Sequence, residues 1–310
     1  MLWTAEEIDL EEDVTDIKEK LTPDERRYLL VVLHFFRDAD LLVLENTFTN
    51  MMRLITLPEA RLFYGLQAYI EGVHAQTYGL MFDKYVTACI NNRVPVTGVS
   101  DEELSTRLVG EGNFIDALTT VKRKSEWARK FMDECVEAKP EHLARILLAF
   151  VIVEGVFFCG AFASIFWLKK RGLCPGLAKA NEFISRDESQ HLRFGALLYD
   201  TLRRDGHGCD RETLRAMMQE AIDIECEFVT QCLPVDLIGI NASKMQSHVR
   251  FTANYVLGLC GEEKMYEESA SPFDFMDLIS LDRKTNFFEE RVTEYSMQTI
   301  ERVFATDVDF

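Results

Sequence analysis

One apolar segment of 23 residues, 146 to 168, constrains the fold more than any other part of the sequence, because its single charged residue is Glu154. A helix of this length and composition either spans a membrane or lies buried in a protein core. An ionisable group in the middle of a bilayer is costly, and the sequence contains no second segment of this kind. We therefore predict a fully buried helix. Its glutamate needs a cation or a proton, since an ionised carboxylate among phenylalanine and valine side chains is severely penalised.

The rest of the chain also favours helices. Apolar residues recur at helical spacing and alternating strand patterns are scarce, so we predict an all-α chain. The sequence TPDE is typical of a helix start, because Thr22 can cap the helix, Pro23 suits its first position and Glu25 completes a capping box. TLPEA at 56 to 60 begins a second helix, and KKRGLCPG at 169 to 176 ends the buried one.

The remaining boundaries follow from the same signals. Further helices are expected around 177 to 204, 211 to 230 and 242 to 261. Residues 91 to 113 are polar and rich in helix breakers, which predicts a surface excursion. Apolar periodicity is lost near the end of the chain, so we expect one domain over residues 1–288 and a flexible C-terminal tail over 289–310.

The composition argues against several classes of partner. The chain has 34 basic and 52 acidic residues and a formal charge of -18, which would repel a nucleic-acid backbone or an anionic membrane. We therefore expect no nucleic acid and no membrane among its partners. The eight cysteines are scattered without a C-x-x-C pair, and the acidic N-terminus does not resemble a secretory signal. Reduced thiols in the cytoplasm are the expectation.

Two histidines are each preceded by a glutamate three residues earlier: Glu71 with His74, and Glu188 with His191. Residues three apart lie on one face of a helix. Two such helices, with one lone carboxylate from each of two others, form the ligand set of ferritin-like dinuclear metal proteins. The carboxylates can bridge and neutralise two iron-type cations, and one imidazole per metal leaves positions open to oxygen.

Helix geometry locates the lone carboxylates. The midpoint between Glu154 and Glu188 falls in the turn at residue 171, so antiparallel helices would bring both residues to one height, roughly 25 Å from the turn. The same construction on Glu71 leads to Asp40, although geometry alone does not exclude Asp38. The two halves form a pseudo-repeat offset by 114 residues (40 to 154) and 117 residues (71 to 188). The predicted metal ligands are Asp40, Glu71, His74, Glu154, Glu188 and His191.

The sequence resembles a known family, the small radical-generating subunit of class I ribonucleotide reductase of the eukaryotic and viral type. The resemblance covers almost the whole chain and is carried by FFRDADLLVLEN, EGVHAQTYGLM, VEGVFFCGAFASIFWLKKRGLCPGL, NEFISRDESQH, SPFDFMDLISLDRKTNFFEERVTEY and FATDVDF. It implies a ferritin-like helical bundle and selects Asp40 over Asp38. Relatives usually carry a longer extension before the position of Trp3, and they have no evident counterpart of residues 91 to 113.

The resemblance also implies roles that spacing cannot assign. Tyr78, otherwise an ordinary core tyrosine, would be oxidised to a stable radical when a diiron centre reacts with dioxygen. An apolar pocket for this radical would comprise Phe158, Phe162 and Ile184. Radical transfer would use Trp3, Asp187 and Tyr295. The closing peptide from Phe304 to Phe310 would dock to a large subunit.

The implied activity is that of a ribonucleoside-diphosphate reductase small chain. This chain would form a homodimer and pass its radical to the large subunit, which reduces ribonucleotides to deoxyribonucleotides. The same six ligands could hold manganese instead of iron. A diiron oxygenase or desaturase would keep these ligands but has no use for Tyr78, Tyr295 or a docking tail. An iron-storage or structural bundle is the non-enzymatic alternative.

Overall fold

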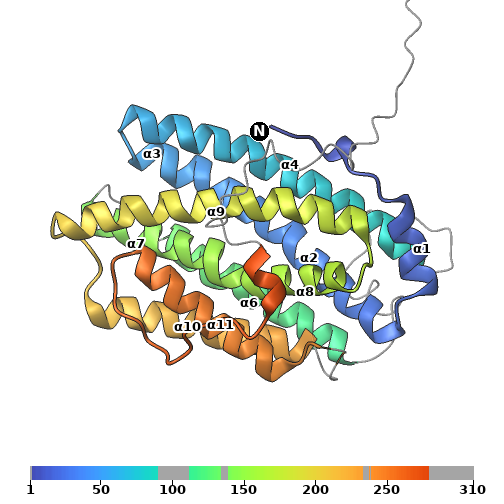
Figure 1. Ribbon diagram of the computed structural model, residues 1–310. Helices are drawn as coiled ribbons and strands as arrows, with labels where there is room; N and C mark the ends of the chain where they lie inside the picture. The colour runs from blue at the N-terminus through green and yellow to red at the C-terminus, as the bar shows by residue number, and fades with distance from the viewer. Residues whose placement is uncertain (1, 90–111, 134–138, 233–236, 238, 279–310) are drawn as a thin grey trace, which may run out of the picture. The chain divides into compact units, whose positions relative to one another are not determined.

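The computed structural model describes residues 2–89, 112–133, 139–232, 237 and 239–278, and the regular secondary structure in these ranges is helical, apart from one isolated bridge between Leu237 and Ile240. The all-α prediction is confirmed. The helices are α1 (Glu11–Glu19), α2 (Pro23–Asn46), α3 (Met52–Leu54), α4 (Pro58–Cys89), α6 (Gly112–Asp133), α7 (Pro140–Ile152), α8 (Cys159–Lys170), α9 (Pro175–Arg204), α10 (Arg211–Cys232) and α11 (Ala242–Leu259) (Figure 1). Two π-helical turns, η2 (Thr47–Met51) and η3 (Val153–Phe157), and two 3₁₀ turns, η1 (Ala5–Glu7) and η4 (Asp274–Leu278), complete the elements.

Helix α2 starts where the capping signal predicts. The Thr22 hydroxyl accepts a hydrogen bond from the Glu25 amide at 3.3 Å, and the Glu25 carboxylate accepts one from the Thr22 amide at 2.8 Å. This capping box satisfies two of the amides that have no partner within the helix. Pro23 takes the first helical position, and Pro58 does the same in α4.

Two antiparallel helix pairs form the frame of the site. The first pair is α2 with α4, and the second is the continuous run α7, η3 and α8 with α9. Helices α4 and α9 pack beside each other, while α10 and α11 pack against the second pair. Figure 1 shows α4 at the top of the view and α10 and α11 at the bottom, with α9 running between them.

The apolar segment is a core helix, as predicted. The run Pro140–Lys170 is long and apolar enough to cross a membrane, but its most apolar window is entirely buried inside the protein. The buried Glu154 lies in the π turn η3, where the regular hydrogen-bond ladder of the helix is interrupted. Such turns are frequent at functional sites.

Some predictions concern residues that lie partly or wholly outside the described ranges. The predicted excursion over 91 to 113 lies mostly outside the described residues, and its last two residues already belong to α6, which the sequence analysis missed. The cause is visible on the buried face of α6, where Lys124 interrupts the apolar side chains of Val121, Trp127 and Phe131. The predicted limit at 288 also lies outside the described residues, as do the tail residues Tyr295, Phe304 and Phe310.

Candidate metal centre

Each of four elements contributes to one buried cluster of acidic and imidazole side chains. Helix α2 carries Asp40 and η3 carries Glu154, while α4 and α9 each carry a Glu-x-x-His pair. All six predicted ligands are buried, and none is more than 4% exposed. A cluster of four carboxylates and two imidazoles in a protein core requires cations or bound protons to balance its charge.

The two Glu-x-x-His pairs interlock. The Nδ1 atom of His191 lies 2.9 Å from Glu71 Oε1 and 3.3 Å from Glu188 Oε2. The Nδ1 atom of His74 lies 2.8 Å from Glu188 Oε1 and 3.5 Å from Glu71 Oε2. Each imidazole therefore faces one glutamate from each helix. Ligand atoms of Glu71, Glu154, Glu188 and His191 all lie within 4.8 Å of one another, an arrangement that could hold a metal ion.

The lone carboxylates have buried oxygens without hydrogen-bond partners among the described residues. These are both oxygens of Asp40 and the Oε2 of Glu154. The Nε2 of Gln67 donates to Glu154 Oε1 and to Glu71 Oε1, at 3.2 Å each. Buried polar atoms without partners are rare because they lose their hydration without compensation. Hard or borderline cations would satisfy these oxygens, so the donor set fits a dinuclear metal group.

The carboxylates titrate abnormally in this cluster. Burial raises the pKa of Asp40 and of Glu154 well above the usual value, and the neighbouring carboxylates add to the rise. Burial also opposes ionisation of Glu188, but a hydrogen bond from Glu154 and the charge of His191 outweigh it and hold the pKa of Glu188 well below its usual value. Without a metal, protons therefore take the place of cations between these carboxylates.

Both histidines favour the protonated form in the metal-free cluster. Burial would lower the pKa of His74, but contacts with Asp187, Glu188 and Glu71 outweigh burial and raise it well above its usual value. The pKa of His191 is likewise raised to about 9, because the charges of Glu71 and Glu188 overcome burial. Metal binding would displace these protons, since a metal ligand must be a neutral imidazole.

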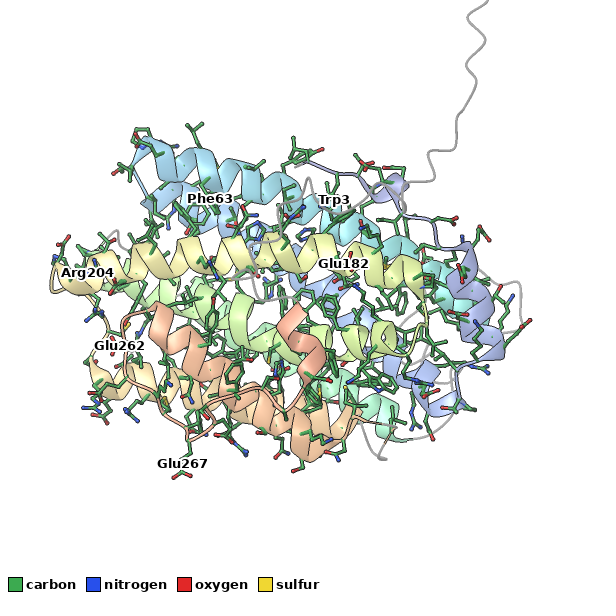
Figure 2. The ribbon with its side chains drawn as sticks, in the orientation of Figure 1. Trp3, Phe63, Glu182, Arg204, Glu262 and Glu267 are labelled. Atoms are coloured by element: carbon green, nitrogen blue, oxygen red, sulfur yellow. The ribbon has the colours of Figure 1, made fainter. Side chains whose placement is uncertain are left out.

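A second chain of contacts joins His74 to the N-terminal segment through Asp187 and Trp3. Trp3 is only 3% exposed, and its Nε1 donates to Asp187 Oδ2 at 2.9 Å. The Nε2 of His74 lies 3.6 Å from the same oxygen, and its ring stacks on Trp3 with centroids 5.8 Å apart. Arg186 donates to the other oxygen of Asp187 at 3.1 Å. Figure 2 shows Trp3 beside the helices that carry the cluster. The structure thus brings Trp3 and Asp187, two of the residues that the resemblance assigns to radical transfer, into contact with the predicted ligand His74.

Tyr78 lies in an aromatic pocket next to the cluster. Its side chain is fully buried, and its ring stacks on Phe36 with centroids 4.4 Å apart and planes 4° apart. Its hydroxyl donates to Asn181 Oδ1 at 2.6 Å. The rings of Phe158 and Phe162 pack on Phe36, with centroids 5.7 Å and 5.0 Å from it. Burial raises the pKa of Tyr78 well above its usual value, and nearby carboxylates raise it further.

The sequence analysis missed three residues of the site. Phe36 stands four residues before Asp40, Gln67 four before Glu71, and Asn181 seven before Glu188. These positions lie one or two turns from a ligand on the same helix face, so helical spacing could have identified them. The predicted pocket residue Ile184 is buried on α9 between Asn181 and Glu188. The side chain of Asp38 lies outside the described residues.

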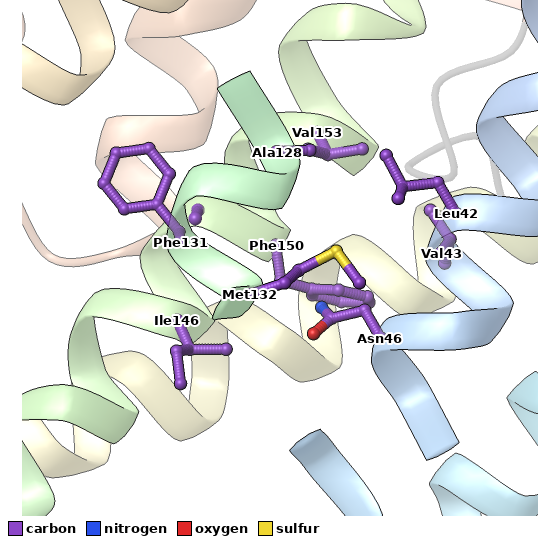
Figure 3. A pocket seen from close by; sticks show the side chains of 10 residues that line it. Leu42, Val43, Asn46, Ala128, Phe131, Met132, Ile146, Phe150 and Val153 are labelled. Carbon is purple, nitrogen blue, oxygen red and sulfur yellow. The ribbon is translucent and has the colours of Figure 1, made fainter. Parts of the chain in front are cut away.

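An apolar cavity of about 20 Å³ adjoins the cluster between α2, α6 and α7 (Figure 3). Val43 and Phe150 line it, one turn from Asp40 and Glu154 respectively. The polar residue in its lining is Asn46. The full lining is Leu42, Val43, Asn46, Ala128, Phe131, Met132, Ile146, Ala149, Phe150 and Val153.

Comparison with known proteins gives consistent matches. Residues 1–272 match the family described as ribonucleotide reductase, small chain. The ribonucleoside-diphosphate reductase small subunit of Dictyostelium discoideum is 41% identical over 294 residues, which cover 95% of this chain and 80% of that protein. The small chain of Vaccinia virus (strain Western Reserve) is 41% identical over 312 residues, or 99% of this chain and 90% of that one. The ribonucleotide reductase Rnr4 homodimer from Saccharomyces cerevisiae has a TM-score of 0.70 and 30% identity, with coverage of 89% and 80%.

Proposed function

This chain belongs to the ribonucleotide reductase small-chain family, and on that premise we propose that it is the radical-generating small subunit of a ribonucleoside-diphosphate reductase. The observation that carries the proposal is a buried group near Tyr78 in which ligand atoms of Glu71, Glu154, Glu188 and His191 lie within 4.8 Å of one another, with His74 in contact with Glu188. The assigned metal ligands are Asp40, Glu71, His74, Glu154, Glu188 and His191. They would hold two iron ions, or manganese ions, with dioxygen as the oxidant.

Two bound iron ions would supply, together with dioxygen, the oxidising power needed to remove one electron and one proton from a phenol. The protein contributes the rest. The glutamates of α4 and α9 face both imidazoles, so they can neutralise and bridge two cations. Asp187 faces the Nε2 of His74 and so directs its Nδ1 toward the cluster. Burial of all six side chains excludes bulk water.

Tyr78 is the phenol that we assign to this oxidation. Burial raises the pKa of its hydroxyl, which favours the protonated phenol, so oxidation to a neutral radical would remove a proton as well as an electron. Asn181 fixes the direction of the hydroxyl, and Phe36 covers one face of the ring. A radical enclosed in this way is protected from solvent and from reductants. Phe158, Phe162 and Ile184 complete the apolar surroundings.

We assign radical transfer to Trp3, Asp187 and Tyr295. The contacts from His74 to Asp187 and on to Trp3 support the first part of this route. Tyr295 and the docking peptide from Phe304 to Phe310 belong to the tail, and their assignment follows from the family resemblance. The partner would be the large subunit, which reduces ribonucleotides to deoxyribonucleotides.

We assign the outer face of α4 to a homodimer contact. Gly65, Gly72 and Gly79 recur every seven residues, and a Cβ atom at any of them would meet nothing within 4 Å. Beside them, Leu62 is 77% exposed and Leu66 is 50% exposed. Small residues flanked by exposed apolar side chains allow two helices to approach closely. The similar Rnr4 protein is a homodimer, which supports a second copy as the occupant.

A cytoplasmic location is also proposed. The described cysteines are all free thiols, four of them buried: Cys159, Cys174, Cys232 and Cys260. Burial raises the pKa of these thiols, so they remain protonated and unreactive. This chemistry fits a reducing compartment.

The test is to load the full chain with ferrous iron in air and to record its electron paramagnetic resonance spectrum. We expect a stable tyrosyl signal that Tyr78→Phe abolishes without loss of iron, and we expect Glu154→Ala to lose iron. A signal that survives in Tyr78→Phe would overturn the assignment of the radical. An oxygenase or desaturase would bind iron without a stable tyrosyl signal, whereas a structural bundle would show unchanged metal content in Glu154→Ala.

A further inference from the structure

A buried charge pair lies behind the metal cluster and has no part in the chemistry described above. Lys124 on α6 is only 2% exposed, and its Nζ lies 2.5 Å from Glu225 Oε2 on α10. Glu225 is fully buried. Gly160 permits the approach, because a Cβ atom there would lie 2.6 Å from Glu225 Oε1. Burial lowers the pKa of Lys124 and raises that of Glu225 to about 7, and each charge moderates the shift of the other.

The ammonium group of Lys124 also binds the backbone of the π turn. Its Nζ donates to the carbonyl oxygen of Phe157 at 3.0 Å. Phe157 is the last residue of η3, the turn that carries Glu154. Backbone carbonyls in such a turn have an irregular helical ladder and can accept from side chains. The contact therefore fixes the end of the turn three residues from the candidate ligand.

A third contact links Lys124 to the surroundings of Tyr78. The ammonium lies 3.8 Å from the ring centroid of Phe35 and 3.5 Å from that of Phe228. Phe35 packs on Phe36 with centroids 5.6 Å apart, and Phe36 stacks on Tyr78. A cation held between two aromatic faces has a defined position. Lys124 thus touches both the turn that carries Glu154 and the helix that carries Asp40.

We propose that Lys124, held by Glu225, is a positioning residue for the metal centre: its bond to the Phe157 carbonyl fixes the π turn and thereby the direction of Glu154. The inference rests on the proposed metal-binding function. Stability alone does not account for the pair, because apolar side chains of similar volume usually stabilise a core as well as a buried ion pair does. An apolar side chain at position 124 could not donate to the Phe157 carbonyl.

The test compares metal binding in matched variants of the full chain. In Lys124→Met/Glu225→Leu, both charges are replaced together, so no unpaired charge remains in the core. Affinity for Fe²⁺ is measured under argon by competition with a chelator, and metal-free thermal unfolding is measured in parallel. We expect Fe²⁺ binding to weaken by about tenfold or more, as for other residues that orient ligands, with the unfolding midpoint unchanged or higher.

The control pair is Lys130 and Glu220, which join the same two helices with a 3.4 Å contact but are exposed. Lys130→Met/Glu220→Leu should bind Fe²⁺ like the wild type. Equal affinity in the wild type and in Lys124→Met/Glu225→Leu would overturn the inference while leaving the proposed function intact. A wild-type chain that binds no Fe²⁺ would overturn both.

An isosteric variant, whose folding is checked by the same thermal unfolding, gives a second and independent measurement. Glu225→Gln keeps the size of the side chain but loosens its hold on Lys124. We expect a smaller but measurable loss of Fe²⁺ affinity. Wild-type affinity in this folded variant would also contradict the positioning role.

Discussion

The two helix pairs of the site repeat the same ligand positions but differ in backbone and in cover. Asp40 lies within a regular α-helix, whereas its counterpart Glu154 lies in the π turn η3. The second pair packs against α10 and α11, whereas α4 in the first pair leaves Leu62 and Leu66 exposed. The repeat therefore predicts the ligand set, while the differences lie in the backbone at the lone carboxylates and in the helices that cover each pair.

The pairs differ most beside the ligands. Tyr78 stands seven residues after Glu71, and the matching position after Glu188 is Gly195. The room for a side chain at 195 is taken by Phe150, whose Cδ1 would lie 2.9 Å from an added Cβ. Phe150 stands four residues before Glu154, as Phe36 stands four before Asp40. Each helix pair thus has a phenylalanine four residues before its lone carboxylate. Only the first pair has room for a tyrosine seven residues after the glutamate of its Glu-x-x-His motif.

The two pairs also differ at the position seven residues before the glutamate of each Glu-x-x-His motif. Seven residues before Glu188 stands Asn181, which accepts the hydrogen bond of Tyr78, and seven before Glu71 stands Tyr64. Tyr64 is fully buried, but its hydroxyl has no hydrogen-bond partner among the described residues. Each side of the cluster therefore has one tyrosine from α4. Only Tyr78 combines a stacked ring with an oriented hydroxyl.

The largest expected effect comes from removing equivalent ligands. Glu71→Ala and Glu188→Ala each delete a carboxylate that faces both histidines, so each should lose most of the bound iron. Glu182→Ala, an exchange at a partly exposed glutamate on α9, is the control. Iron per chain is measured by metal analysis after desalting. If only one of the two variants lost metal, the halves would not be functionally equivalent.

Adding a side chain at Gly195 in the second pair should lower the free energy of unfolding. Gly195→Ala places a methyl group within 3.1 Å of Phe150 and Val151, whose helix cannot move freely in the core. We expect a loss of about 1–3 kcal/mol in the free energy of unfolding. Urea denaturation of the metal-free chain measures it. An unchanged midpoint would mean that the space at 195 is less restricted than the contacts indicate.

A glycine exchange on the outer face of α4, in the first pair, should act on assembly instead. A side chain at Gly72 meets nothing within 4 Å in one chain, and leucine favours a helix by about 0.8 kcal/mol over glycine. Gly72→Leu should therefore fold at least as stably but hold two copies apart. Sedimentation at several concentrations should show weaker dimerisation at normal iron content. Dimerisation as strong as in the wild type would place the contact on another face.

Helical periodicity in the sequence was sufficient to predict where the candidate ligands lie. Five of the six predicted ligands follow from spacing within helices and from the distance to a turn, which are local properties, whereas the choice of Asp40 over Asp38 came from the family resemblance. The π turn at Glu154 was not predicted, because its geometry depends on packing and on the contact of Lys124 with Phe157. The pairing of Lys124 with Glu225 joins residues far apart in sequence, so spacing along the chain could not predict it. Because Lys124 interrupts the apolar face of α6, this helix was also missed.

The smallest effect is expected at the second tyrosine. Tyr64→Phe removes a buried hydroxyl that has no hydrogen-bond partner in the described part of the chain, so the free energy of unfolding should change by no more than about 1 kcal/mol. Because its hydroxyl lacks an acceptor like Asn181, the tyrosyl signal should keep its full intensity, in contrast to Tyr78→Phe. Spin quantification after iron loading measures both variants. A weaker tyrosyl signal in Tyr64→Phe than in the wild type would show that Tyr64 carries part of the radical. Both helix pairs would then contribute to the radical site, to different extents.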